Sequence, residues 1–115
     1  MTGTGERKLD DIFTALADPG RRGMVDRLSV GPATVKELAE PAGMGLPSAL
    51  KHLRVLEKGG IVVSTKAGRT RTYRIDPAAF GAINAWVRQR ETAMNAAFDR
   101  LVLAIAENPE GEDGA

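Results

Sequence analysis

The stretch PSALKHLRVLEKGGIV, residues 47–62, decides how this chain folds. Three apolar residues in it repeat with the spacing of one face of an α-helix, namely Ala49, Leu53 and Leu56. The pair Gly59-Gly60 ends that helix, because glycine tolerates the left-handed backbone at a helix C-terminus. The apolar and β-branched residues that follow favour a strand. The stretch therefore predicts a helix at about 46–58 and a strand at 61–65.

A second strand and a long helix are predicted after it. The turn Ala67-Gly68-Arg69 leads into residues 70–75, which alternate and complete a β-hairpin with a basic tip. Asp76-Pro77 then opens a final helix, since aspartate is a good N-cap and proline at the first helical position loses no needed hydrogen bond. Apolar residues along that helix follow the a/d spacing of a coiled-coil seam, which Arg90 breaks once: Phe80, Ile83, Val87, Met94, Phe98, Leu101 and Ile105.

Two shorter helices are predicted near the start of the chain. Apolar residues from Leu9 to Leu16 lie at positions i, i+3, i+4 and i+7, which is one helix face. Asp18-Pro19 ends that helix and begins a second one, which closes near Ser29. We therefore expect two consecutive helices before the turn Gly31-Pro32.

A third helix precedes the deciding stretch. Thr34 and Glu37 form a capping box, in which each side chain accepts a hydrogen bond from the other residue's backbone amide. Pro41 is expected to end this helix early, because proline in a helix interior costs about 3 kcal/mol. A short turn, Gly43-Met44-Gly45, then leads into the fourth helix. The third and fourth helices are therefore a helix-turn-helix candidate, and the hairpin behind them adds a wing.

The length and composition set the outline of the fold. A chain of 115 residues with 43% hydrophobic and 27% charged residues is typical of one compact globular domain. We expect a disordered N-terminal tail at 1–8, a winged-helix domain at 9–106 and an acidic disordered tail at 107–115. The predicted fold class is mainly α with a small β-hairpin: a winged helix-turn-helix of five helices and a two-stranded wing.

Several classes of function are excluded by what the sequence lacks. With no cysteine and one histidine, it offers neither disulfides nor a thiolate or multi-histidine metal site. It also has no Ser/His/Asp set and no glycine-rich phosphate motif, so we expect no enzyme activity, no metal site and no cofactor. The longest apolar run, Leu101–Ala106, is far shorter than the roughly 18–20 residues of a membrane span. Residues 1–8 have no apolar core for a secretory signal, and the expected location is the cytoplasm.

The charge is unevenly distributed, although the formal net charge is only +1. Between Met44 and Ile75 there are seven lysines and arginines against Glu57 alone, a balance of +6. A charge run by itself also fits a solvated surface. Here it coincides with the fourth helix and the hairpin, where a winged helix reads base edges and neutralises phosphates. The middle of the chain is therefore predicted to bind a polyanion.

Four segments together resemble the ArsR-type winged helix-turn-helix transcriptional regulators. They are ALADPGRR at 15–22, GPATVKELA at 31–39, the stretch at 47–62, and GRTRTYRIDP at 68–77. The resemblance covers roughly residues 9–105, and its most specific part is the string from Lys51 to Val62 followed by a basic hairpin. It implies a homodimer on a palindromic double-stranded DNA operator, usually a repressor that regulates its own or a neighbouring gene. An unidentified small-molecule effector is a further expected partner.

The resemblance also implies which residues form the two sites. The implied DNA-binding residues are Leu46, Pro47, Ser48, Leu50, Lys51, His52, Arg54, Lys66, Arg69 and Arg71. The implied dimer interface is formed by Leu9, Ile12, Phe13, Leu16, Phe80, Val87, Met94, Phe98, Leu101 and Ile105. The metal sensors of this family use cysteine clusters, or histidines and carboxylates on the last helix. This chain has no cysteine and no histidine after His52, and Glu91 and Asp99 alone could hold only a weak hard cation, so control by a thiolate or histidine metal site is not expected.

Some assignments stay open at this point. Family members usually have Ser-Gln where this chain has Gly45-Leu46, and often Ser where it has Leu50. Leu46 and Leu50 therefore either face DNA or extend the buried stripe of the fourth helix. His52 is either a packed, hydrogen-bonded helix residue or a phosphate contact. Arg21-Arg22 is either a solvent-exposed pair, a phosphate contact or a salt bridge that fixes the motif. A winged helix used for protein–protein contact is the alternative function.

Overall fold

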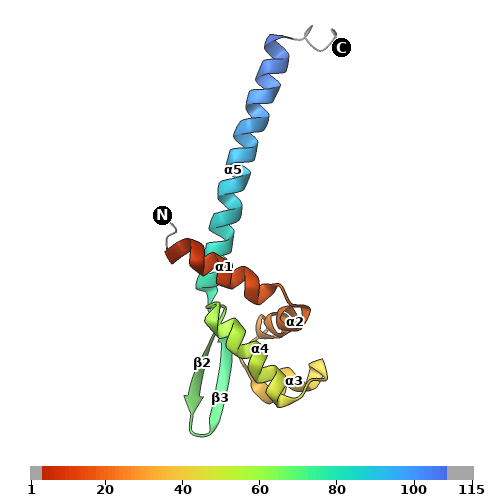
Figure 1. Cartoon of the computed structure of the whole chain (residues 1–115), viewed down its shortest axis with the longest axis vertical. Coiled ribbons are helices and arrows are strands. Elements are labelled where there is room, and N and C mark those ends of the chain that lie inside the picture. Colours follow the sequence, from red (N-terminus) through yellow and green to blue (C-terminus); the bar gives the residue numbers. More distant parts are fainter. Residues whose placement is uncertain (1–3, 109–115) are drawn as a thin grey trace. The chain divides into compact units, whose positions relative to one another are not determined.

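The computed structural model describes residues 4–108 of the chain, and Figure 1 shows its helices and strands. They are α1 (Thr4–Leu16), α2 (Pro19–Leu28), β1 (Ala33–Thr34), α3 (Val35–Ala42), α4 (Leu46–Lys58), β2 (Val62–Ala67), β3 (Thr70–Ile75) and α5 (Pro77–Glu107). The chain divides into two compact units, one ending at Ala82 and one beginning at Ile83. The first unit holds the sheet, the four shorter helices and the start of α5, and the second holds the rest of α5.

The core of the first unit is aliphatic, as a chain with 4% aromatic residues requires. Its largest fully buried side chains come from α1, α4 and the entry to β2: Ile12, Leu53, Leu56, Ile61 and Val62. No charged or polar side chain is buried among the residues whose burial is described. The helix predicted at 46–58 is therefore confirmed together with the face that it buries.

The ends of the helices follow the predicted caps. Asp18 accepts a hydrogen bond from the Arg21 amide at 3.0 Å, and both bonds of the Thr34–Glu37 capping box are present. The expectation that Pro41 ends α3 early is wrong, because α3 continues through it to Ala42. A proline in the last turn removes only one helical hydrogen bond, and Gly43 closes the helix in the left-handed conformation that glycine tolerates.

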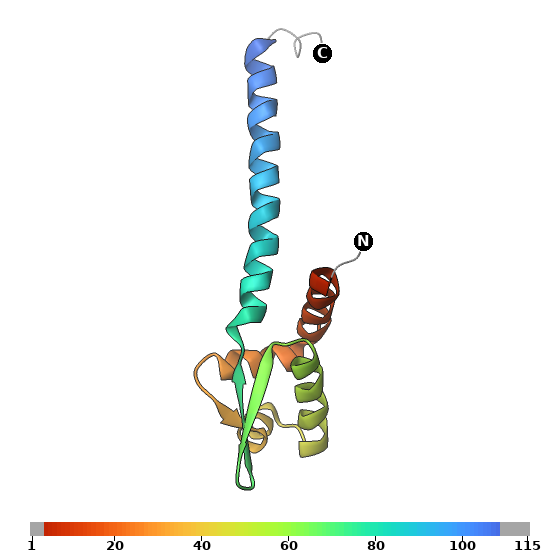
Figure 2. The ribbon, with the colours of Figure 1, turned by 90° about the vertical axis from the view of Figure 1, so that its left-hand side faces the viewer.

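The sheet has one strand more than the sequence predicts. Its order is β1-β3-β2, with both pairs antiparallel, and β1 contributes only two residues opposite Tyr73 and Thr72. The hairpin register runs from Val62 opposite Ile75 to Ala67 opposite Thr70, so the loop contains only Gly68 and Arg69. Gly68 has a φ of +63°, as a two-residue hairpin turn requires. The hairpin formed by β2 and β3 is the wing. Its tip extends beyond the helices of the first unit (Figure 2).

The predicted boundaries change at the N-terminus. Helix α1 begins at Thr4, whereas the sequence predicts a disordered tail at 1–8 ahead of the first helix. Thr- and Gly-rich composition suggested disorder there, but a helix nucleated by the apolar face that begins at Leu9 extends easily toward its N-terminus. Residues 1–3 of that tail lie outside the described residues. So does the predicted acidic tail beyond Asn108, and α5 ends at Glu107.

The second unit is a helix with an apolar surface. From Asn84 to Asn108 every residue is exposed. The large apolar side chains among them include Met94, Phe98, Leu101 and Leu103, each more than half exposed. Within residues 4–108, no helix combines the length and the apolar character that crossing a membrane needs.

Candidate nucleic-acid interface

A compact turn joins α3 to α4. The Gly43 amide donates to the carbonyls of Ala39 and Glu40, and the Met44 amide donates to Ala39 at 3.1 Å. These bonds satisfy carbonyls that the end of α3 leaves unpaired. Gly45 then serves as the N-cap of α4 without a side-chain hydrogen bond. The turn therefore fixes where α4 starts and leaves the amides of its first turn uncapped by a side chain.

Helix α4 separates its residues cleanly between two faces. Ala49, Leu53 and Leu56 have no exposed surface, whereas Leu46 is 48% exposed. The outer face also carries four of the predicted DNA-binding residues, all exposed: Pro47, Ser48, Lys51 and Arg54. Leu46 is therefore not part of the core, and its alternative reading as a core residue is wrong. The N-terminal half of α4 presents a mixed apolar and basic surface.

Leu50 has an intermediate position. It is half-buried and lines a groove of about 390 Å³ between α4, the start of α3 and the wing. The other residues that line the groove are Thr34, Val35, Lys36, Arg69, Thr70, Arg71 and Tyr73. Sequence reasoning missed the contribution of Thr34, Lys36 and Thr70 to this surface. The capping box identified Thr34 as a helix start, but only the pairing of β1 with β3 brings that start beside the wing.

The wing carries two free cations and two that are held in place. Lys66 and Arg69 are exposed and make no hydrogen bond or ion pair with any residue whose side chain is described. Arg71 Nη1 donates to Ser64 Oγ at 2.8 Å, and Ser64 Oγ donates to Glu57 Oε2 at 3.2 Å. Arg74 Nη1 donates to Thr65 Oγ1 at 3.0 Å. The chain of bonds through Ser64 links the wing to α4 and orients Arg71.

Tyr73 closes the base of the wing. It is 4% exposed, and burial raises the pKa of its phenol, with the nearby Glu57 carboxylate adding to the shift. Tyr73 lies on β3, the strand that carries Arg71 and Arg74, and pairs with Ala33 of β1 on one side and Ser64 of β2 on the other. Tyr73 therefore supports the basic surface rather than forming part of it.

His52 belongs to a polar cluster between α2 and α4. Its Nδ1 lies 3.4 Å from Arg21 Nη1 and 3.9 Å from Asp18 Oδ2. The hydrogen bond from the Arg21 amide holds the pKa of the Asp18 carboxyl below its usual value. The structure thus gives His52 a hydrogen-bonded position inside one chain, which was the alternative to a phosphate contact. Added at Gly20, a Cβ would lie 3.0 Å from the Asp18 carboxylate, so glycine lets this cluster close.

Arg21 and Arg22 fix the junction of α1 and α2. Arg21 Nε donates to the Ala15 carbonyl at 2.7 Å, and Arg22 Nη1 donates to the Leu16 carbonyl at 2.7 Å. Both arginines lie at the N-terminus of α2, which is unfavourable for a cation, but they cap the C-terminus of α1, which is favourable. Both arginines therefore hold the junction through hydrogen bonds to the end of α1 rather than through the salt bridge considered from the sequence.

Comparison with known proteins places this geometry in a family. The sequence profile described as "Helix-turn-helix domain" matches residues 16–65. The HTH-type transcriptional regulator Rv2034 of Mycobacterium tuberculosis is 33% identical over 107 residues, which cover 93% of this chain and 95% of that protein. A crystal structure of an ArsR family transcriptional regulator is 44% identical and covers 83% of this chain and 97% of its own, with a TM-score of 0.74. This chain belongs to the ArsR family.

A third comparison concerns the quaternary state of a relative. The homodimeric winged helix-turn-helix DNA-binding domain of a Mycobacterium bovis protein is 27% identical, with a TM-score of 0.61. It covers 77% of this chain and 84% of that domain. The ArsR-family protein described here is accordingly a transcriptional regulator with a helix-turn-helix DNA-binding domain. Its fold is the predicted winged helix-turn-helix, enlarged by β1.

The residues predicted for a dimer interface divide by burial. Ile12 is fully buried inside the chain, so its place in the predicted interface is wrong: an amphipathic helix shows one apolar stripe, and α1 turns that side of it toward α4. Phe13 lies at the edge of the stripe and is 41% exposed, while Leu9, Leu16 and Phe80 are partly exposed. The remaining predicted residues are exposed on α5: Val87, Met94, Phe98, Leu101 and Ile105.

The metal ligands of the family's sensors have no counterpart in the described part of the chain. Between residues 4 and 108 no three His, Cys, Asp or Glu side chains gather in a way that could hold a metal ion. Glu91 and Asp99, two of the three acidic residues of α5, are both exposed. Regulation without a metal ion stays a prediction for this ArsR-family protein.

Proposed function

We propose that this ArsR-family regulator is a repressor that binds a palindromic operator as a homodimer and controls its own or a neighbouring gene in the cytoplasm. In this proposal α4 enters the major groove while the wing lies along the adjacent backbone. The observation that carries the proposal is the shared exposed surface of α4 and the wing, which holds unpaired cations on both sides of the Leu50 groove.

The charges on this surface suit phosphates. Lys51, Arg54, Lys66 and Arg69 make no hydrogen bond or ion pair within the described chain, so their charges are available to an anionic partner. Such contacts fix the protein on the duplex without reading its sequence. Each neutralised phosphate also releases counterions, and binding therefore weakens as the salt concentration rises.

Sequence reading is assigned to the short and apolar side chains at the N-terminal half of α4. Ser48 is exposed and its hydroxyl can donate or accept at a base edge, whereas Leu46 and Leu50 offer apolar contact to thymine methyl groups. No arginine stands at these positions to pair with guanine. We therefore expect half-sites rich in A·T pairs, with centres about 34–36 Å apart.

Dimer formation is supported by the apolar surface of α5. Seam residues such as Met94, Phe98 and Leu101 are each more than half exposed in the single chain. Burying them in a second copy gains about 25 cal/mol for each Å² of apolar area removed from water. A two-fold symmetric dimer also presents two α4 helices, which a palindromic operator requires. The signal that ends repression in this proposal is a small molecule rather than a metal ion.

The test is a fluorescence anisotropy titration of labelled duplexes at several salt concentrations. The duplexes are an inverted repeat from upstream of the gene and a scrambled version of it. The native protein should prefer the inverted repeat. Arg69→Ala should weaken binding to both duplexes about equally and reduce the salt slope by about one unit.

Arg88→Ala is the matched control, because Arg88 is an exposed arginine on α5 that makes no hydrogen bond or ion pair in the described chain. It should leave the affinity and the salt slope unchanged. Equal affinity of the native protein for both duplexes would overturn the proposal, and would favour the use of this winged helix for protein–protein contact. Unchanged binding by Arg69→Ala would remove the wing from the interface.

A further inference from the structure

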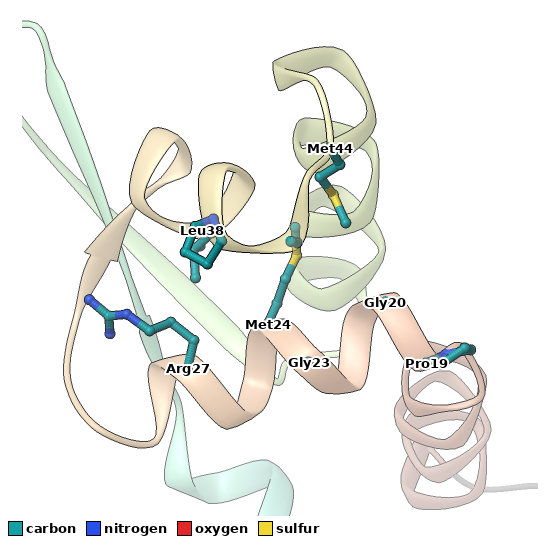
Figure 3. Close-up of a pocket in the computed structure, with 9 residues that line it drawn as sticks. Pro19, Gly20, Gly23, Met24, Arg27, Leu38 and Met44 are labelled. Carbon is teal, nitrogen blue, oxygen red and sulfur yellow. The ribbon is translucent and has the colours of Figure 1, made fainter.

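A groove of about 360 Å³ lies on the first unit between α2, the C-terminal end of α3 and the turn before α4. In Figure 3, Met24 rises from α2 toward α3, and Met44 points into the same space from the turn. Met24 and Leu38 are 2% and 3% exposed and form the floor of the groove, so its accessible apolar surface comes mainly from Pro41 and Met44. This volume is at the lower end of the roughly 300–1,000 Å³ of small-molecule sites, and flexible methionines adapt well to varied ligands.

Gly23 lines the groove without contributing a side chain. A Cβ added there would meet nothing within 4 Å, so no contact inside the chain requires glycine at this position. Gly20, one turn earlier, differs, because the Asp18–His52 cluster approaches it closely. A glycine inside a helix destabilises it relative to alanine. Gly23 therefore keeps a space open at the expense of helix stability.

The charge of the lining selects the kind of ligand. Arg27 is the single charged residue of the groove and lies at the end opposite Pro19 (Figure 3). Its Nη1 donates to the Gly31 carbonyl at 3.0 Å, which holds the guanidinium in place. The other N–H groups of this guanidinium make no hydrogen bond in the described chain, although the pKa of the Glu37 carboxyl is lowered by the hydrogen bond from the Thr34 amide and, to a lesser extent, by this charge. The groove therefore suits a ligand with an apolar part and one carboxylate. The apolar part would face the methionines, and the carboxylate would pair with Arg27.

We propose that this groove binds a small apolar carboxylate, with its hydrocarbon part against Met24 and Met44 and its carboxylate on Arg27. The groove is bounded by Pro41 and Met44, which flank the turn that fixes the start of α4. A ligand there shifts the turn and weakens operator binding. This regulatory consequence rests on the proposed function, whereas ligand binding itself does not.

Methyl NMR of the full chain tests binding without DNA. The chain has four methionines, so ¹³C-methyl labelling gives two reporters in the groove, Met24 and Met44, and one on α5, Met94. Titration with octanoate should shift the two groove signals and leave Met94 in place. Equal shifts at Met94, or no shift at Met24 and Met44, would overturn the site.

Three variants and one control separate the role of Gly23 from that of Arg27. Gly23→Leu fills the groove and should abolish the shifts, whereas Gly81→Leu, at another open helical glycine outside the groove, should preserve them. Gly23→Ala should raise the Tm by about 4–8 °C while weakening octanoate binding. Arg27→Gln should weaken octanoate binding by about tenfold and leave binding of neutral octanol unchanged. Undiminished binding of octanoate by both Gly23→Leu and Arg27→Gln would rule out this pose.

The regulatory step has its own readout. Octanoate should raise the operator Kd by at least about fivefold, and the operator should weaken octanoate binding by the same factor, as linkage requires. If octanoate shifts the methyl signals but does not change the operator affinity, the groove binds the ligand and its regulatory role is overturned. Failure of the native chain to select any operator, with methyl shifts intact, would instead count against the proposed function alone.

Discussion

Helix α4 and the part of α5 after Ala82 are both apolar on one side, yet they use that side differently. In α4 the residues Ala49, Leu53 and Leu56 are fully buried by α1, α2, α3 and the sheet. From Asn84 onward α5 has no buried or half-buried residue, and Phe98 remains 63% exposed. One helix completes the core of its own chain, and the other presents an apolar face that a single chain leaves open.

The two helices teach that periodicity identifies an apolar face but not what covers it. Both patterns have three- and four-residue spacings, and both predict helices correctly. The difference lies in the neighbouring sequence, which supplies α4 with partners in three dimensions. If a second copy covers α5, the two helices must respond oppositely to substitution: α4 through folding, and α5 through association.

The largest effect is expected at the buried face of α4. Leu53→Ala should lower the free energy of unfolding by about 2–5 kcal/mol, because it removes a fully buried side chain and leaves a cavity. Urea denaturation measures the loss. Leu103→Ala is the matched control, since Leu103 is 60% exposed and lies off the α5 seam, and its effect should stay within about 0.5 kcal/mol. If both variants lost the same free energy of unfolding, the proposed difference between α4 and α5 would be wrong.

The next effect concerns the seam of α5. Phe98→Asp should raise the Kd of the dimer at least about 30-fold, which corresponds to about 2 kcal/mol, because it places an unpaired charge in each copy of the interface. Sedimentation at micromolar concentration should then show a monomer where the native chain forms a dimer. Leu103→Asp, with the same charge on the other side of α5, should leave the dimer intact. A native chain that sediments as a monomer would refute the predicted interface.

Much of the fold was predictable because local chemistry determines it. The capping box at Thr34, the cap-plus-proline devices at Asp18 and Asp76, and Gly68 in the hairpin all act within a few residues of sequence. Strand β1 was missed because two residues carry no alternation and form a strand only by pairing with β3. The continuation of α3 past Pro41 depends on the C-cap geometry of Gly43, which propensity alone does not reveal.

The candidate site was predictable in outline but not in its internal connections. The basic residues of α4 and the wing were evident from charge. The link from Glu57 through Ser64 to Arg71 was not, since it joins residues whose neighbourhood exists only after the hairpin folds onto α4. The role of Arg21 stayed open among alternatives, because the carbonyls that accept its hydrogen bonds belong to the preceding helix.

The smallest effect separates the two faces within α4 itself. Leu50 is half-buried beside the wing, whereas Leu53, one turn along, is fully buried. Leu50→Ser should therefore cost much less stability than Leu53→Ala, and its main effect should be on DNA. Loss of an apolar contact to a thymine methyl should reduce discrimination at one A·T pair of each half-site by about 1 kcal/mol, the low end of base-specific contacts.

A panel of duplexes with single base-pair changes measures that discrimination. Native protein should bind best with thymine at one position, and Leu50→Ser should bind the variants at that position almost equally, with other positions unaffected. Replacing the isobutyl group of Leu50 by a hydroxymethyl group at a half-buried site leaves the buried residues Ala49, Leu53 and Leu56 in place, so the Tm should change little. Unchanged base preference together with a Tm lowered by several degrees would make Leu50 part of the core. In that case Leu50 would stabilise the fold instead of contacting a base. Base reading by α4 would then depend on Leu46 and Ser48.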